Sequence, residues 1–278
     1  MLEEKQLDQT ERLIYQASGP LGAPVIVYLP GIQGDWTPMW RLRRLLGARF
    51  RLIEVAYPRA PDWTLDDYAA KFARLLKELG LERVHLLAES FGSLVAWTFG
   101  LRHPERVASL MLAGGFCRSP GRVRVALARG ALGLVPAALL DRAIDLYCWY
   151  FQRRRRFPEK WELPDVFFPA ARTRQGWRTT RGRLRIINKT DLRPHVPAAR
   201  FPILYLGGAR DSIVPVRREV RHLERALPAR CRFRSHLLPG VPHAVLPASF
   251  RQADRIITEW VREIEGCADG EAREATIS

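Results

Sequence analysis

Short apolar runs alternate with stretches of helical spacing along this chain, and this alternation limits the folds that it can adopt. Before Ser90 the apolar runs lie at residues 25–29, 50–55 and 84–87, and the helical stretches at 38–46 and 66–79. Thr64 precedes the second helical stretch as a candidate N-cap, with Asp67 three residues further on. Such alternation is typical of a mostly parallel sheet covered on both faces by helices. We therefore expect an α/β fold.

The alternation is interrupted once, after a helical stretch to His103 and an apolar run at 107–112. Residues 117–197 contain amphipathic stretches, prolines and aromatic residues, but no pattern of a buried strand. Strand and helix patterns then resume at 203–206, 216–226, 232–237 and 249–264. We predict an α/β core formed by residues 1–116 and 197–265, an inserted helical cap at 117–196 and a flexible tail at 266–278.

A serine joins the apolar run at 84–87 to the helical pattern that follows it. Ala88 and Gly92 flank Ser90 at two residues' distance on either side. A tight strand-to-helix turn lifts the serine hydroxyl above a sheet and requires small neighbours for steric room. Ala88 stands where glycine is usual, so the pattern is A-x-S-x-G. It predicts a nucleophilic serine; the alternative is a serine that only caps the following helix.

A serine hydroxyl is a weak nucleophile, so it requires a base and a carboxylate that orients the base. Asp211 lies in a loop just after the apolar run at 203–206, and His243 follows the run at 232–237. Side chains at the carboxyl ends of parallel strands share one crevice. We predict that Ser90, Asp211 and His243 form a catalytic triad. The alternatives are a turn aspartate and a surface histidine.

From residue 11 to residue 264 the chain resembles the α/β-hydrolase superfamily. The segment Leu29-Pro30-Gly31-Ile32-Gln33-Gly34 is similar to the family's His-Gly turn, with Pro30 where histidine is common. The resemblance implies an oxyanion hole formed by the backbone N–H groups of Ile32 and Phe91. It also implies acyl transfer to water with no cofactor, on an ester or thioester with an apolar acyl group. A carbon–carbon bond hydrolase with the same triad and a catalytically silent binding protein remain alternatives.

Other features of the sequence exclude several classes of protein. The first ten residues are polar and acidic, without the basic start and apolar run of a secretory signal, so we expect a cytoplasmic protein. The four cysteines lie far apart, with no C-x-x-C pair, and predict neither a metal site nor a disulfide framework. The longest apolar stretch is shorter than the roughly 20 residues that span a bilayer. We therefore expect no transmembrane segment.

Positive charge is concentrated in the inserted cap. Residues 117–195 contain 18 Lys and Arg against 6 Asp and Glu, which is +12 of the net charge of +16. The run Arg153, Arg154, Arg155 and Arg156 is its densest part, and such a field attracts anionic partners. An acidic acyl carrier protein ranks first, because the short cap resembles that of pimeloyl-carrier-protein methyl ester esterases; an anionic lipid surface ranks second. Nucleic acid is disfavoured, since no binding motif accompanies the charge. The alternative is a merely solvated basic face.

Overall fold

A seven-stranded sheet forms the centre of the protein in the computed structural model, which describes residues 11–136, 138–140, 142–143, 146 and 174–277. The strand order is β1-β3-β2-β4-β5-β6-β7. Strand β1 runs antiparallel to β3, and all other neighbours are parallel. The strands are β1 (Ile14–Ser18), β2 (Val25–Leu29), β3 (Arg51–Ala56), β4 (Val84–Glu89), β5 (Val107–Ala113), β6 (Ile203–Gly208) and β7 (Phe233–Leu238).

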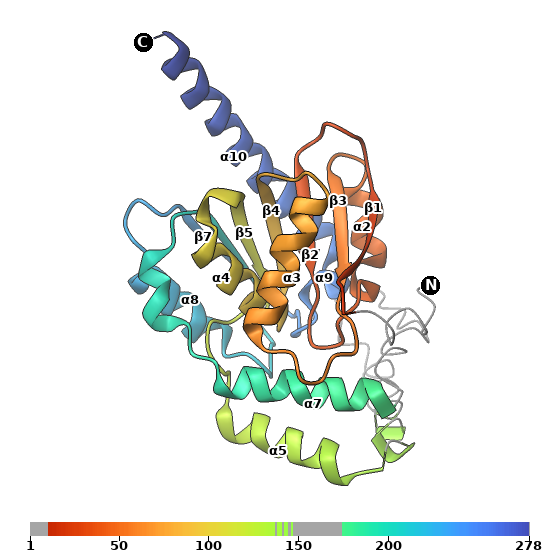
Figure 1. The fold of residues 1–278 in the computed structure, drawn as a ribbon. Coiled ribbons are helices and arrows are strands. Elements are labelled where there is room, and N and C mark those ends of the chain that lie inside the picture. Colours follow the sequence, from red (N-terminus) through yellow and green to blue (C-terminus); the bar gives the residue numbers. More distant parts are fainter. Residues whose placement is uncertain (1–10, 137, 141, 144–145, 147–173, 278) are drawn as a thin grey trace.

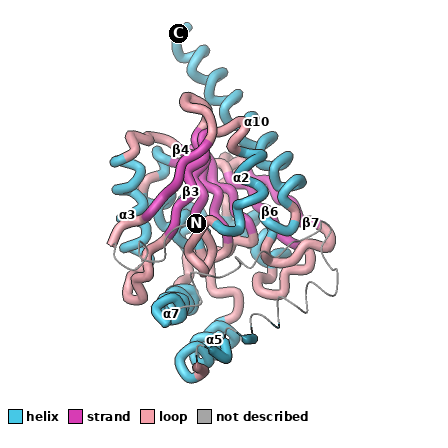
Figure 2. Tube along the Cα trace, turned by 90° about the vertical axis from the view of Figure 1, so that its right-hand side faces the viewer, coloured by secondary structure: helices cyan, strands magenta, loops and turns pink. Residues whose placement is uncertain are grey.

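Helices cover both faces of the sheet. α3, α4 and α8 lie on one face, and α2, α9 and α10 lie on the other (Figure 1 and Figure 2). The helices are η1 (Thr37–Met39), α2 (Trp40–Leu46), α3 (Leu65–Glu78), α4 (Gly92–Arg102), η2 (Pro104–Arg106), α5 (Arg122–Leu134), α7 (Arg174–Lys189), η3 (Arg193–Ala198), α8 (Val216–Ala226), α9 (Val245–Ala248) and α10 (Phe250–Ile277). The layered α/β fold expected from the sequence is confirmed.

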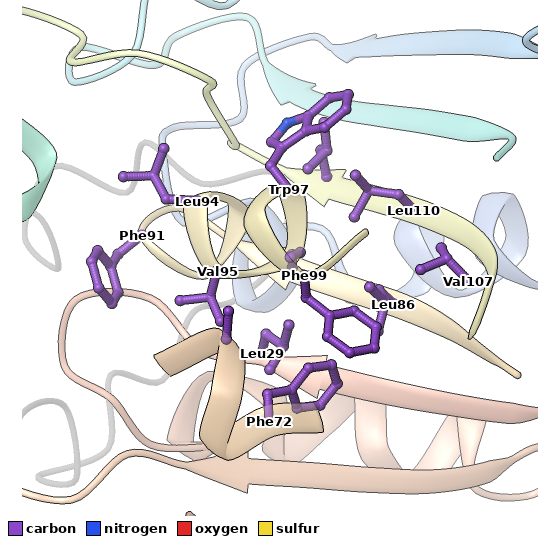
Figure 3. Close-up of a cluster of buried hydrophobic side chains, with 14 of the residues drawn as sticks. Leu29, Phe72, Leu86, Phe91, Leu94, Val95, Trp97, Phe99, Val107 and Leu110 are labelled. Atoms are coloured by element: carbon purple, nitrogen blue, oxygen red, sulfur yellow. The ribbon is translucent and has the colours of Figure 1, made fainter. Parts of the chain in front are cut away.

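The central strands are apolar on both faces because each face packs against a helical layer. Every residue of β4, β5 and β6 is buried. On the α3/α4 face the rings of Phe72 and Phe99 meet edge to face, with centroids 4.8 Å apart, and Trp97 is fully buried (Figure 3). Trp260 of α10 is fully buried on the other face. These two cores hold β4, which leads to Ser90, in a fixed position.

The elements predicted from the apolar runs are confirmed with small shifts at their ends. Thr64 caps α3 through a capping box with Asp67, whose amide donates to the Thr64 hydroxyl. The helix expected at 38–46 is divided into η1 and α2. Strand β1 was not predicted. It is a half-exposed edge strand, and its residues lack the continuous apolar run of a buried strand.

The structure describes the inserted region in part and the tail almost completely. Helices α5 and α7 pack against each other below the sheet (Figure 1). The prediction for Arg153, Arg154, Arg155 and Arg156 lies outside the described residues. Helix α10 continues to Ile277, through most of the tail predicted at 266–278, and the flexibility of that tail stays a prediction. Alanine, glutamate and arginine recur in that segment and favour continuation of a helix, although two glycines oppose it.

Truncation of Phe72 tests the core beside α4. We expect Phe72→Ala to lower the free energy of unfolding by about 3–5 kcal/mol, because it leaves a cavity against Phe99. Lys77→Ala, at an exposed position of the same helix, should change it by less than about 0.5 kcal/mol. Urea unfolding followed by fluorescence measures both. Equal effects of the two substitutions would contradict this account of the core.

Candidate active site

Ser90 lies in a strained turn between β4 and α4. Its φ is +49°, and no other residue besides glycine has a positive φ in the described part of the chain. The Ser90 amide donates to the carbonyl oxygen of Ala113 at the end of β5, at 3.0 Å. Left-handed backbone at a residue with a side chain is held only where the surroundings enforce it, and it is concentrated at functional sites. The turn projects the Ser90 hydroxyl from the carboxyl edge of the sheet.

Gly92 allows the turn to pack directly on the loop after β2. A Cβ atom at this position would lie 2.3 Å from the Leu29 carbonyl oxygen and 2.7 Å from that of Pro30. This close approach places the loop that contains Ile32 against the turn that contains Phe91. No described residue accepts a hydrogen bond from either amide. That these two amides form an oxyanion hole, as the resemblance implies, stays a prediction.

Asp211 lies in the loop after β6 and has its orientation set by the backbone. Its Oδ1 accepts hydrogen bonds from the amides of Ile213 and Val214, each at 2.8 Å. The other oxygen, Oδ2, lies 2.7 Å from His243 Nδ1. Gly208 permits the loops after β6 and β7 to come this close, because a Cβ there would lie 2.2 Å from the Pro242 carbonyl oxygen.

His243 connects the aspartate to the serine. Its Nε2 lies 2.9 Å from Ser90 Oγ. Since a carboxylate only accepts, Nδ1 carries the proton in the contact with Asp211, and Nε2 is left as the acceptor for the serine hydroxyl. The Asp211 side chain is fully buried, whereas that of His243 is 19% exposed. The arrangement can transfer the Ser90 proton to the imidazole and stabilise the resulting charge.

A cavity of about 240 Å³ opens beside Ser90 and His243. The inserted region contributes Val125 of α5 and Leu184 and Ile187 of α7 to its wall. The remaining described lining residues are Gly31, Ile32, Gln33, Pro38, Glu89, Phe116, Pro120, Ile213 and Ala244. The lining is mostly apolar, and its described residues include no arginine or lysine. An uncharged, apolar group fits such a wall.

Glu89 places a buried carboxyl group directly beside the serine. Its Oε2 accepts a hydrogen bond from the Tyr28 hydroxyl at 2.5 Å. Burial raises the pKa of Glu89, and the Tyr28 hydrogen bond and the nearby His243 oppose that rise. Burial also raises the pKa of Tyr28 well above its ordinary value, so its hydroxyl stays protonated and donates. The sequence analysis did not single out Glu89, because the A-x-S-x-G pattern allows any residue between Ala88 and Ser90.

Arg183 of α7 reaches from the inserted region into the loop that carries Ile32. Its side chain is buried, and the residue is 3% exposed. Nη1 donates to the Ile32 carbonyl oxygen at 2.7 Å, Nη2 to that of Pro58 at 3.2 Å, and Nε to the Tyr68 hydroxyl at 3.1 Å. The guanidinium also lies over the Tyr57 ring, 5.4 Å from its centroid. In the sequence Arg183 is one of many arginines of the inserted region, and no local pattern distinguishes it from the others. This contact was therefore not predicted.

The structure thus brings Ser90, Asp211 and His243 together and places Ile32 and Phe91 beside them. Fold and site together are those of an alpha/beta hydrolase. A profile of the alpha/beta hydrolase fold matches residues 24–243, so the chain belongs to this family.

Relatives within the family have several different names. Over 222 residues the chain is 27% identical to a protein of Variovorax paradoxus named "Putative carbamate hydrolase RutD", covering 73% of this chain and 80% of that one. Over 110 residues it is 36% identical to a 2-hydroxy-6-oxononadienedioate/2-hydroxy-6-oxononatrienedioate hydrolase of Pseudomonas putida, and this match spans about a third of each chain, 34% and 37%. The crystal structure of the enol-lactonase from Burkholderia xenovorans LB400 superimposes with a TM-score of 0.73 at 18% identity, covering 90% of this chain and 96% of that one.

Replacement of Arg183 tests the connection between α7 and the Ile32 loop. Arg183→Met removes three hydrogen bonds from a charged donor and leaves their acceptors buried, so we expect the free energy of unfolding to fall by about 3–5 kcal/mol. Arg183→Lys should lose less, because an ammonium group can keep one of these bonds. Lys189→Met, at an exposed position of α7, is the matched control. Thermal and urea unfolding measure the three variants, and an Arg183→Met protein as stable as the control would refute the connection.

Proposed function

We propose that this protein is a serine hydrolase that cleaves a carboxylic ester or thioester with an apolar acyl group. One observation carries the proposal: Ser90 Oγ, His243 and Asp211 form a hydrogen-bonded chain with distances of 2.9 Å and 2.7 Å, at the wall of an apolar cavity. In this reaction Ser90 is the nucleophile, His243 the general base and Asp211 the residue that orients the histidine. The cap of residues 117–196 supplies part of the acyl-binding wall through Val125, Leu184 and Ile187.

The chemistry follows from the positions of these groups. Ser90 Oγ attacks the carbonyl carbon of the substrate while its proton passes to His243 Nε2. The carbonyl oxygen becomes an oxyanion and accepts hydrogen bonds from the amides of Ile32 and Phe91. The bond to the leaving oxygen or sulfur then breaks, and the leaving group takes the proton from His243. A water molecule, deprotonated by His243, attacks the acyl-enzyme in the same way and releases the acid and the serine.

The size and lining of the cavity limit the acyl group. A volume of about 240 Å³ lies just below the usual range of roughly 300–1,000 Å³ for small-molecule sites. Its described wall is apolar apart from Gln33, Glu89, Ser90 and His243. A short or medium apolar acyl chain suits this cavity better than a long or charged one.

A carbon–carbon bond hydrolase with the same triad is the second candidate, and the similarity to the Pseudomonas putida dienedioate hydrolase favours it. A dioate carries two carboxylates, which arginine or lysine side chains would bind. The described lining of the cavity contains neither residue. For that reason an uncharged ester ranks above a dioate, although the triad itself serves both reactions.

Covalent labelling tests the role of Ser90. A fluorophosphonate probe should label the wild-type protein and leave Ser90→Ala unlabelled, because only the activated serine reacts. Ser212→Ala removes an exposed serine near Asp211 and should label like the wild type.

A panel of p-nitrophenyl esters of increasing acyl length should give a maximum kcat/KM at short or medium chains. Absence of both labelling and hydrolysis in the folded wild type would favour the catalytically silent alternative.

The role of Asp211 gives a separate prediction. Asp211→Asn should retain the fold but lower kcat by about 10³–10⁴-fold, because an amide can favour the wrong histidine tautomer. Asp191→Asn is the control, since Asp191 pairs with Arg193, which lowers the pKa of Asp191 to about 2. The control should keep near-normal kcat on the same ester. Near-normal turnover by Asp211→Asn would assign the orienting role to another carboxylate.

A further inference from the structure

A second cavity, here called the arginine cavity, lies between α5, α7 and the loop after β3 and has a volume of about 330 Å³. No described residue lines both this cavity and the one beside Ser90. Helix α7 contributes apolar residues to the cavity beside Ser90 and basic residues to the arginine cavity. The described lining of the arginine cavity is Pro61, Asp62, Arg129, Arg178, Arg181, Gly182 and Arg185.

Two glycines let the walls of the arginine cavity come close together. A Cβ atom on Gly182 would lie 2.1 Å from the Pro61 carbonyl oxygen, so the lack of a side chain lets α7 pack on the loop after β3. A Cβ atom on Gly133 of α5 would lie 2.9 Å from Cζ of Arg181, so α5 packs directly against a guanidinium group of α7. The cavity is therefore formed where three segments pack against one another.

The arginines of this cavity have no described counter-charge. None of the four guanidinium groups forms an ion pair or hydrogen bond with a residue in the described part of the chain, Asp62 included. Arg129 and Arg185 are half-buried, so solvent screens their charges less than those of the exposed Arg178 and Arg181. The described lining has a net charge of +3. A bound anion would relieve the repulsion among these like charges.

The charge and geometry of the arginine cavity favour a phosphate group over a carboxylate. A carboxylate carries a single negative charge, whereas a phosphate ester carries about −1.5 to −2 at neutral pH and offers three strong acceptor oxygens. The planar guanidinium fork binds phosphate oxygens through two parallel hydrogen bonds. Arg178, Arg181 and Arg185 recur at intervals of three and four residues, which places their forks on one face of α7.

We propose that the arginine cavity binds the phosphate or diphosphate group of a small molecule, at a site separate from the cavity beside Ser90. The bound group accepts hydrogen bonds from Arg129 of α5 and from the arginines of α7, and so connects the two helices. The volume lies near the lower end of the range for small-molecule sites, which suits a phosphate group with a small organic part. A ligand that binds only the folded chain also stabilises it.

Isothermal titration calorimetry with inorganic pyrophosphate tests the site in the full chain. Binding needs no hydrolysis, so Ser90→Ala should bind with the same Kd, whatever the labelling of Ser90 shows. We expect one pyrophosphate per chain, and an unfolding temperature that rises with pyrophosphate concentration. Arg178→Gln with Arg181→Gln should raise the Kd about tenfold or more, because it removes two charge-assisted donors from exposed positions. Arg181→Lys, which keeps the charge but loses the fork, should raise the Kd less than that pair.

A matched control separates this site from a general effect of charge. Arg218→Gln with Arg221→Gln removes two exposed arginines from α8, also three residues apart, which do not line the cavity. The control should keep the Kd within about twofold of the parent protein, because salt screens charges outside the cavity. Equal losses in the control and the cavity variant would overturn the proposal. So would acetate binding as tightly as pyrophosphate, or no binding of pyrophosphate by the folded wild type.

Two phosphate esters distinguish the sources of the bound group. Glycerol 3-phosphate is a soluble metabolite, and dihexanoyl phosphatidic acid carries the same phosphate monoester on a short-chain lipid. Tighter binding of the first assigns the cavity to a soluble phosphate ester, and tighter binding of the second assigns it to a lipid headgroup. In either case Arg178→Gln with Arg181→Gln must weaken the binding, and an unchanged Kd for both esters would overturn the proposal.

Discussion

The strained turn between β4 and α4 determines the arrangement of the whole site. A residue with a side chain in the left-handed region adds roughly 1–3 kcal/mol of strain. Strand β4 can hold Ser90 there because it pairs with β2 and β5 and is buried along its full length. Gly92 then lets the turn pack against the loop after β2, which contains Ile32. The buried sheet is thus what holds Ser90 in a strained conformation at its carboxyl edge.

Arg183 connects this turn region to the inserted helices. A buried guanidinium usually pairs with a carboxylate, but here two carbonyl oxygens and a tyrosine hydroxyl satisfy it. The Ile32 carbonyl that it binds belongs to the same short loop as the Ile32 amide. A shift of α7 would therefore move the loop that contains Ile32, whose amide we propose as an oxyanion donor.

The helices of the inserted region have different surroundings on their two faces. On the inner side, Val125 of α5 and Leu184 and Ile187 of α7 line the cavity beside Ser90. On the outer side α5 exposes Val123, Leu127 and Leu134. A second cavity, lined by arginines of both helices, lies between α5, α7 and the loop after β3.

The sequence alone determined the buried strands, the helices between them and the order of Ser90, Asp211 and His243. Those features are local: a buried strand requires a continuous apolar run, and a tight turn requires small neighbours. The edge strand β1 could not be predicted in this way, because it is half exposed and its partner β3 lies more than thirty residues away. The contacts of Glu89 and Arg183 could not be predicted from the sequence either. Helix α7 has arginine at several positions, and only packing against the Ile32 and Pro58 loops decides that Arg183 is buried while Arg178 and Arg181 stay exposed. Such choices depend on contacts between distant segments, which the local pattern of one helix does not contain.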